Sequence, residues 1–217
     1  MKLITGNANV RAAARDYERY SSDLQGDADV RDYKQLPLEV DPPLHTDIRA
    51  LIAPWFTKDS LAKHESEFTE IITALVAKAK SNGEVEVVFD LALPMIVQCL
   101  GVVFGRPQDV DEWYSWGPDT WITDEDGIRH GDHLDRYLKK TFDELDAHPT
   151  DDLFGQVNRA ELDGRPLTRL EKNGIANLVL AGGRDTVVKL VCGSLSYLAH
   201  NEKLRASLAD NRDAIPG

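Results

Sequence analysis

Cysteine is scarce in this sequence, and long apolar runs and an excess of basic charge are lacking. The 217 residues include two cysteines, which cannot form a disulfide framework, so we expect a reducing compartment and a cytoplasmic protein. No uninterrupted apolar run reaches the roughly 18 residues of a membrane span, and the N-terminus has no basic-then-apolar signal pattern. A formal net charge of −12 argues against nucleic acid and against anionic membranes as partners.

Apolar residues recur at helical spacing along most of the chain, which predicts a mainly α-helical fold. The sequence has no internal repeat and no low-complexity tract, and its composition indicates no domain boundary within residues 1–217. We expect helices over roughly 58–80, 91–104, 109–122, 130–147 and 168–200, a short strand at 84–88, and a hairpin turn at Asp163-Gly164.

The most informative segment is the last of these helices. Thr168 and Glu171 form a capping box at its start, and apolar residues then follow almost without a polar break, which predicts a buried central helix. Its middle, residues 182–186, reads Gly-Gly-Arg-Asp-Thr. Two glycines cost about 1 kcal/mol each in a helix interior, and a threonine hydroxyl can bond the carbonyl one turn back and open the helix. The segment therefore predicts a helix defect beside a ligand; a kink without chemistry is the alternative.

A second informative segment is residues 41–57, DPPLHTDIRALIAPWFT. Asp41 suits the N-cap of a helix, and Pro42 suits its first position. His45 and Arg49 are four residues apart, so they share a helix face, where two donors suit a carboxylate ligand. The alternative is an ordinary solvated helix face.

Both segments resemble parts of the cytochrome P-450 superfamily of haem-thiolate monooxygenases. Residues 182–186 fit the family's distal-helix pattern, Ala/Gly-Gly-x-Asp/Glu-Thr, and residues 41–57 look like its third helix, with the pattern DPP-x-H-x-x-x-R. The resemblance covers essentially the whole chain, and the form is most similar to soluble bacterial members of the camphor-hydroxylase type. It implies a mainly α cytochrome P-450 fold.

The resemblance also implies roles for matching residues on the long helix. Asp185 and Thr186 would be the catalytic pair that delivers protons to bound oxygen. Gly182 and Gly183 would let the haem lie against the helix. Leu178 and Ala181, one turn earlier, would face substrate, with plain core packing as the alternative.

Three further residues receive expected roles. His45 and Arg49 would hold the haem propionates, as the resemblance implies. Tyr33 lies in the loop-like stretch 24–40, which corresponds to a substrate-lining stretch in the family, and its ring could both pack on a substrate and hydrogen-bond it. A surface tyrosine is the alternative.

The family's axial cysteine has no counterpart here. It stands in a loop of pattern Phe-x-x-Gly-x-x-x-Cys-x-Gly, which neither Cys99 nor Cys192 fits. Both lie in apolar helical runs, where a free cysteine packs as a small hydrophobe. We assign no metal ligand within the chain. We expect an incomplete fold that lacks the N-terminal start and the C-terminal haem-ligand portion, so that residues 1–217 form a single partial domain.

The implied reaction is insertion of one oxygen atom from O2 into a small apolar organic substrate, with haem b carrying the chemistry. Electrons would come from NAD(P)H through a ferredoxin or flavoprotein. We expect the chain alone to be inactive because the cysteine is absent. The alternative is a haem-free, inactive truncated helical domain or a small-molecule binding protein.

Overall fold

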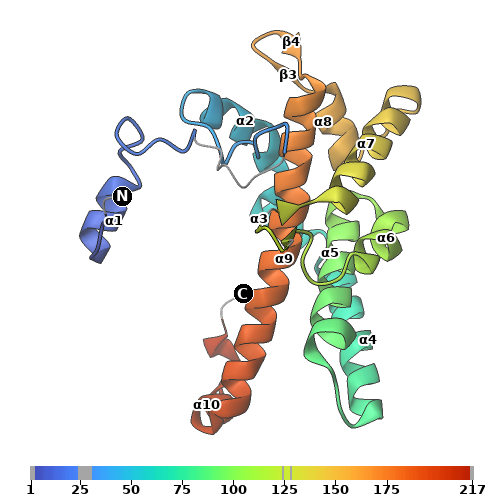
Figure 1. Cartoon of the computed structure of the whole chain (residues 1–217). Helices are drawn as coiled ribbons and strands as arrows, with labels where there is room; N and C mark the ends of the chain where they lie inside the picture. Colours follow the sequence, from blue (N-terminus) through green and yellow to red (C-terminus); the bar gives the residue numbers. More distant parts are fainter. Residues whose placement is uncertain (1–2, 24–30, 124, 128, 216–217) are drawn as a thin grey trace.

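The computed structural model describes residues 3–23, 31–123, 125–127 and 129–215, and most of them are helical (Figure 1). The mainly α fold predicted from the sequence is confirmed. The α-helices of the described part are α1 (Asn7–Ala13), α2 (Leu44–Ile52), α3 (Lys58–Ala62), α4 (Glu65–Asn82), α5 (Leu93–Phe104), α6 (Val110–Ser115), α7 (Asp132–Ala147), α8 (Leu153–Arg159), α9 (Arg169–His200) and α10 (Glu202–Asp210).

The shorter elements connect these helices. Single helical turns lie at η1 (Ala53–Phe56), η2 (Val87–Ala92), η3 (Pro107–Asp109) and η4 (Arg212–Ala214), and η2 has π-helical geometry. Two antiparallel hairpins pair β1 (Ile122–Thr123) with β2 (Arg129–His130) and β3 (Glu161–Leu162) with β4 (Arg165–Pro166).

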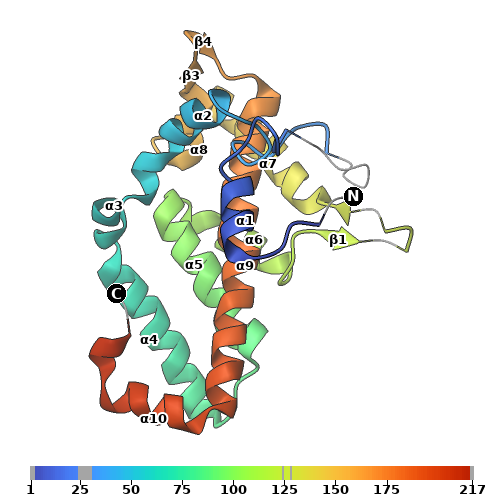
Figure 2. The ribbon, with the colours of Figure 1, turned by 90° about the vertical axis from the view of Figure 1, so that its left-hand side faces the viewer.

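Helix α9 is the axis of the molecule (Figures 1 and 2). It runs without interruption for 32 residues, and both bonds of the predicted capping box between Thr168 and Glu171 are present. Its N-terminal half packs against α5, α7 and α8, while α10 turns back from its C-terminal end. The buried residues of α9 lie between Gly174 and Val188, so the predicted burial is confirmed for this part of the helix, whereas the part beyond Val188 is half-buried or exposed.

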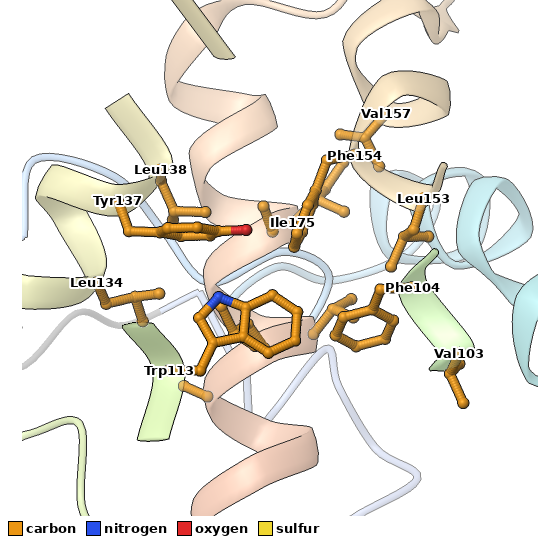
Figure 3. Close-up of a cluster of buried hydrophobic side chains, with 14 of the residues drawn as sticks. Val103, Phe104, Trp113, Leu134, Tyr137, Leu138, Leu153, Phe154, Val157 and Ile175 are labelled. Atoms are coloured by element: carbon orange, nitrogen blue, oxygen red, sulfur yellow. The ribbon is translucent and has the colours of Figure 1, made fainter. Parts of the chain in front are cut away.

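The core next to α9 is built around aromatic rings (Figure 3). Phe104 of α5 lies edge-on to Trp113 of α6, with ring centroids 6.1 Å apart, and to Phe154 of α8, at 5.8 Å. Tyr137 of α7 closes the cluster against Trp113, at 5.9 Å and 84° between the planes. Edge-to-face pairs contribute about 0.5–1.5 kcal/mol each beyond area burial. This cluster fixes α5–α8 on one side of α9.

Three expected elements differ from the structure. The helix expected over 58–80 is divided into α3 and α4 by a turn at Lys63 and His64. The helix expected over 109–122 ends at Ser115, because Gly117 adopts a left-handed conformation (φ 77°) and Pro118 follows it. The chain then forms the β1–β2 hairpin. Residues 84–86 do not form the expected strand; the η2 turn begins at Val87, where the Glu86 carboxylate accepts a hydrogen bond from Phe89 N. The hairpin turn at Asp163-Gly164 is confirmed.

One described helical stretch, residues 87–104, is long and apolar enough to cross a membrane by length and composition, with a mean hydropathy of 2.2. It includes η2 and α5 and packs on α9, α4 and α6, and about one third of it is buried inside the structure. The expectation that no membrane is involved stays a prediction.

Candidate active site beside the middle of the long helix

The middle of α9 forms one wall of a cavity of about 410 Å³. The volume lies within the roughly 300–1,000 Å³ range of small-molecule sites. Its lining combines one face of α9 with two loop segments, and comprises Leu178, Ala181, Gly182, Asp185, Thr186 and Lys189 from α9, Gln35 and Leu38 from the segment before α2, and Asp119, Trp121 and Thr123 from the segment after α6. Five of the residues singled out from the sequence therefore meet here.

Thr186 and Gly182 place a hydroxyl and bare backbone at the cavity. The Thr186 hydroxyl donates to the Gly182 carbonyl, with 2.5 Å between the oxygens, as the sequence predicts. A Cβ added at Gly182 would meet only the Leu178 side chain, at 3.8 Å, so this face of the helix is open. The expected opening of the helix is not present, since α9 remains α-helical throughout.

Gly183 faces the other way. A Cβ added there would lie 3.3 Å from the side chain of Leu100 on α5. The second glycine of the pair thus lets α5 approach α9 closely, and it does not line the cavity. The two glycines are adjacent in sequence but lie on different faces of the helix.

Asp185 is a buried anchor. Its carboxylate accepts hydrogen bonds from Thr120 N (2.8 Å) and Thr120 Oγ1 (2.6 Å), and it pairs with the guanidinium of Arg184. Arg184 is fully buried and donates to the carbonyl oxygens of Trp113 (3.2 Å) and Gly117. The acid beside the two glycines thus has structural partners, and its expected part in proton delivery stays a prediction. The pair ties the segment after α6 to α9.

The sequence reasoning missed Arg184 and Lys189. A cation within an apolar helix was the available signal for Arg184. Lys189 lies one turn beyond Asp185, and its ammonium lies 3.0 Å from the Asp119 carboxylate. Burial opposes ionisation of Asp119, but hydrogen bonds from Lys189 and from Trp121 N outweigh it, so the pKa of Asp119 is lowered.

Tyr33 is buried and does not line the cavity. Its hydroxyl donates to the Asp135 carboxylate and accepts from Asn177 Nδ2 (2.9 Å). Burial, with Asp135 adding to it, raises the pKa of Tyr33. Asn177 Oδ1 in turn accepts from Gln35 Nε2 (2.7 Å), and Gln35 does line the cavity. Tyr33 is therefore linked to the cavity through Asn177 and Gln35.

His45 and Arg49 lie away from the cavity, on helix α2. This helix begins at Leu44, later than expected, because the Asp41 carboxylate accepts from Ser21 and Ser22 instead of capping it, which lowers the pKa of Asp41. Within the described residues, neither the His45 nor the Arg49 side chain has a hydrogen-bond or ion-pair partner. Both donors are available to an external carboxylate.

Both cysteines lie in helices, half-buried, Cys99 in α5 and Cys192 in α9. Burial raises the pKa of each thiol, and Glu86 adds to the effect at Cys192. Reactive or metal-binding cysteines need the opposite, a stabilised thiolate. Neither thiol lines the cavity.

Comparisons with known proteins identify relatives of this chain among the cytochromes P-450. The chain is 28% identical to the vitamin D(3) 25-hydroxylase of Pseudonocardia autotrophica over 226 residues, covering 98% of this chain and 55% of that protein. It is 25% identical to cytochrome P-450 109 of Bacillus spizizenii, covering 82% and 47%. A solved structure described as a carbohydrate active P-450 superposes with a TM-score of 0.76 at 33% identity, covering 85% of this chain and 48% of that one.

The chain carries part of a cytochrome P-450 fold. It spans about half the length of the curated relatives it matches, as expected for an incomplete fold. No protein-family model matches it. The recognition made from residues 41–57 and 182–186 is confirmed at the level of relationship and fold. The roles of individual residues, and the division into one domain, stay predictions.

Proposed function

We propose that this chain is the part of a haem-dependent monooxygenase that holds the substrate against the oxygen-activating centre. The observation that carries the proposal is the cavity on α9, where the Thr186 hydroxyl and the bare backbone of Gly182 share one wall with substrate-sized space. The relatedness to cytochromes P-450 supplies the reaction class, insertion of one oxygen atom from O2.

The donor set of the chain fits a haem. A haem is a flat apolar ring with two carboxylates, and α2 offers His45 and Arg49 on one face without other partners among the described residues. The C-terminal half of α9 exposes apolar side chains beyond Thr186, with Leu190 67% exposed. When bound, haem b supplies the activation of O2. Because Cys99 and Cys192 are unsuited, the proposal takes the thiolate ligand from a segment outside these residues.

Each residue at the cavity then has a chemical task. Thr186 holds a proton on Oγ1 beside the bare backbone of Gly182, and rotation about its Cβ–Oγ1 bond can turn that proton from the Gly182 carbonyl toward the cavity. Asp185, with both oxygens engaged, keeps Thr120 and the segment after α6 against α9, and that segment contributes Asp119, Trp121 and Thr123 to the cavity lining. Leu178 and Ala181 supply apolar contact.

Two substrate classes are candidates. Leu38, Leu178 and Ala181 favour the small apolar molecule expected from the sequence. Most of the other lining residues are polar, and one relative is described as carbohydrate active, which favours a carbohydrate. Electrons would reach the site from NAD(P)H through a ferredoxin or flavoprotein in the cytoplasm, a proposal that rests on the resemblance alone.

The reduced carbon monoxide spectrum of the protein made from its complete reading frame tests the function. We expect the thiolate-type band, unchanged by Cys99→Ala or Cys192→Ala, because neither thiol is the ligand. Loss of the band in either variant would show that a ligand of the chain had been missed. A wild-type protein that binds no haem would support the alternative, a haem-free binding domain.

Haem retention tests the propionate site separately. The double variant His45→Ala/Arg49→Ala removes two charge-assisted hydrogen bonds, so we expect haem affinity to fall at least about tenfold. Lys58→Ala, which removes an exposed cation from the neighbouring helix α3, is the control and should retain haem. Equal haem retention in the double variant and the control would contradict the assignment.

A further inference from the structure

We infer that the cavity recognises a neutral, polyhydroxylated ring, a single sugar unit, through Asp119, Lys189, Gln35 and Trp121. The inference rests on the proposed function, whose substrate class it specifies. None of the four residues was singled out from the sequence as a substrate contact, and all four line the cavity that Thr186 and Gly182 share.

Asp119 and Lys189 present donors and acceptors side by side. Their side chains are 46% and 64% exposed, and the ammonium lies 3.0 Å from Oδ2. Lysine carries three N–H donors, so two remain for a ligand, and the carboxylate oxygens keep lone pairs beyond those used by Lys189 and Trp121 N. Adjacent donors and acceptors match the vicinal hydroxyl groups of a sugar, each of which both donates and accepts.

The pairing of these charges also selects against charged ligands. An anion would have to compete with Asp119 for the ammonium, and a cation would compete with Lys189 for the carboxylate. A neutral hydroxyl can bridge both groups without breaking their contact. The ion pair therefore favours a ligand that is polar and uncharged.

Gln35, which also lines the cavity, is held in a fixed orientation. Its Nε2 donates to Asn177 Oδ1, and Asn177 is fully buried, with its own Nδ2 on the Tyr33 hydroxyl. This chain of bonds sets which end of the Gln35 amide faces Asn177, and it leaves Oε1 to accept from a ligand. Tyr33 and Asn177 are thus positioning residues for Gln35.

Trp121 supplies the apolar surface that a sugar ring needs. Its indole is half-buried, with Arg31 over the ring at 5.4 Å from the centroid, and its benzo edge presses on the backbone of Gly131, where an added Cβ would lie 2.6 Å away. These contacts fix the ring, and its remaining surface lines the cavity. The C–H face of a pyranose packs on such a surface while its hydroxyls reach the polar groups.

Isothermal titration calorimetry on the ferric holoenzyme tests the inference without turnover. The probes are methyl glycosides of neutral hexoses, with limonene as an apolar comparison. We expect at least one glycoside to bind, and Lys189→Met and Asp119→Asn each to weaken it about 10- to 100-fold, as loss of a charge-assisted hydrogen bond does. Lys189→Arg should retain most of the affinity.

Lys140→Met is the matched control, because Lys140 of α7 is also 64% exposed, lies 3.9 Å from the carboxylate of Glu112 on α6, and does not line the cavity. It should bind the glycoside as the wild type does. Binding of limonene but no glycoside, or equal glycoside affinity in Lys189→Met and the wild type, overturns the inference. A thiolate-type carbon monoxide spectrum with no glycoside binding would leave the monooxygenase standing, whereas glycoside binding without that spectrum would leave only the sugar site.

Discussion

The Asp185→Asn variant distinguishes between two roles for Asp185, a structural anchor and a proton relay. In the structure its carboxylate is 5% exposed and accepts from both the backbone and the hydroxyl of Thr120, while pairing with a fully buried Arg184. The asparagine side chain could keep only one acceptor oxygen, so its amide group would face either the donors of Thr120 or those of Arg184. The guanidinium would also lose its ion-pair partner.

The expected cost follows from that geometry. Breaking a buried ion pair by removing one partner costs about 3–5 kcal/mol, and the acceptor that the asparagine variant retains places it near the lower figure, about 3 kcal/mol. For a protein of this size about 1 kcal/mol corresponds to roughly 2–4 °C, so we expect Tm to fall by about 6–12 °C. Arg184→Met should lower the free energy of unfolding by a similar amount, because it leaves the buried Asp185 carboxylate without its ion-pair partner.

Thermal unfolding followed by circular dichroism measures both variants and the double variant Arg184→Met/Asp185→Asn. Because the two side chains interact directly, the double variant should lose less than the sum of the single losses, with a coupling of at least about 1 kcal/mol. Asp151→Asn is the control: its ion pair with Arg159 is at the surface, with the Asp151 side chain 99% exposed, and should change stability by less than about 0.5 kcal/mol. If Asp185→Asn unfolds like the wild type and only turnover slows, the anchor is refuted and the relay is supported.

Three further outcomes are expected. In the holoenzyme, Thr186→Ala should divert NAD(P)H consumption from product to hydrogen peroxide, while Thr186→Ser retains coupling, because the hydroxyl at this position places a proton beside Gly182. Full coupling in the alanine variant would refute this role. Gly174→Ala should lower the free energy of unfolding, measured by chemical denaturation, by at least about 1–3 kcal/mol, because the added Cβ would lie 2.1 Å from the carbonyl oxygen of Lys34. Gly193→Ala in the same helix meets no neighbouring atom and should stabilise the protein by up to about 1 kcal/mol. Equal effects of the two substitutions would contradict the packing. Hydrogen bonds from Arg165 and Thr168 lower the pKa of Glu171 from 4.5 to about 2. Its contribution to stability is therefore complete above pH 4.5 and is lost as the pH falls toward 2. If the stability of a Glu171→Gln protein varied with pH as steeply as that of the wild type over this range, the assignment would be wrong.

The features predicted correctly from the sequence depend on neighbours within a few residues. The capping box of Thr168 and Glu171, the turn at Asp163-Gly164 and the bond from Thr186 to Gly182 each join groups at most four residues apart. The spacing of apolar residues likewise predicted α9, because the hydrogen bonds of a helix join residues four apart. The turn at Gly117 and Pro118 explains why α6 is shorter than expected.

What the tertiary structure decided is where each of these side chains is used. Thr120 and Asp185 are 65 residues apart, and Gln35 and Asn177 are 142 apart, so no local pattern brings them together. Folding also gives Asp185, the expected proton relay, buried structural partners, and it places Tyr33 behind Gln35 instead of at the cavity. Gly182 and Gly183 are indistinguishable in the sequence, yet in the structure Gly183 packs against Leu100 of α5, whereas Gly182 faces open space at the cavity. The motif and the fold family follow from the sequence, but the chemistry of the cavity depends on partners that only folding supplies.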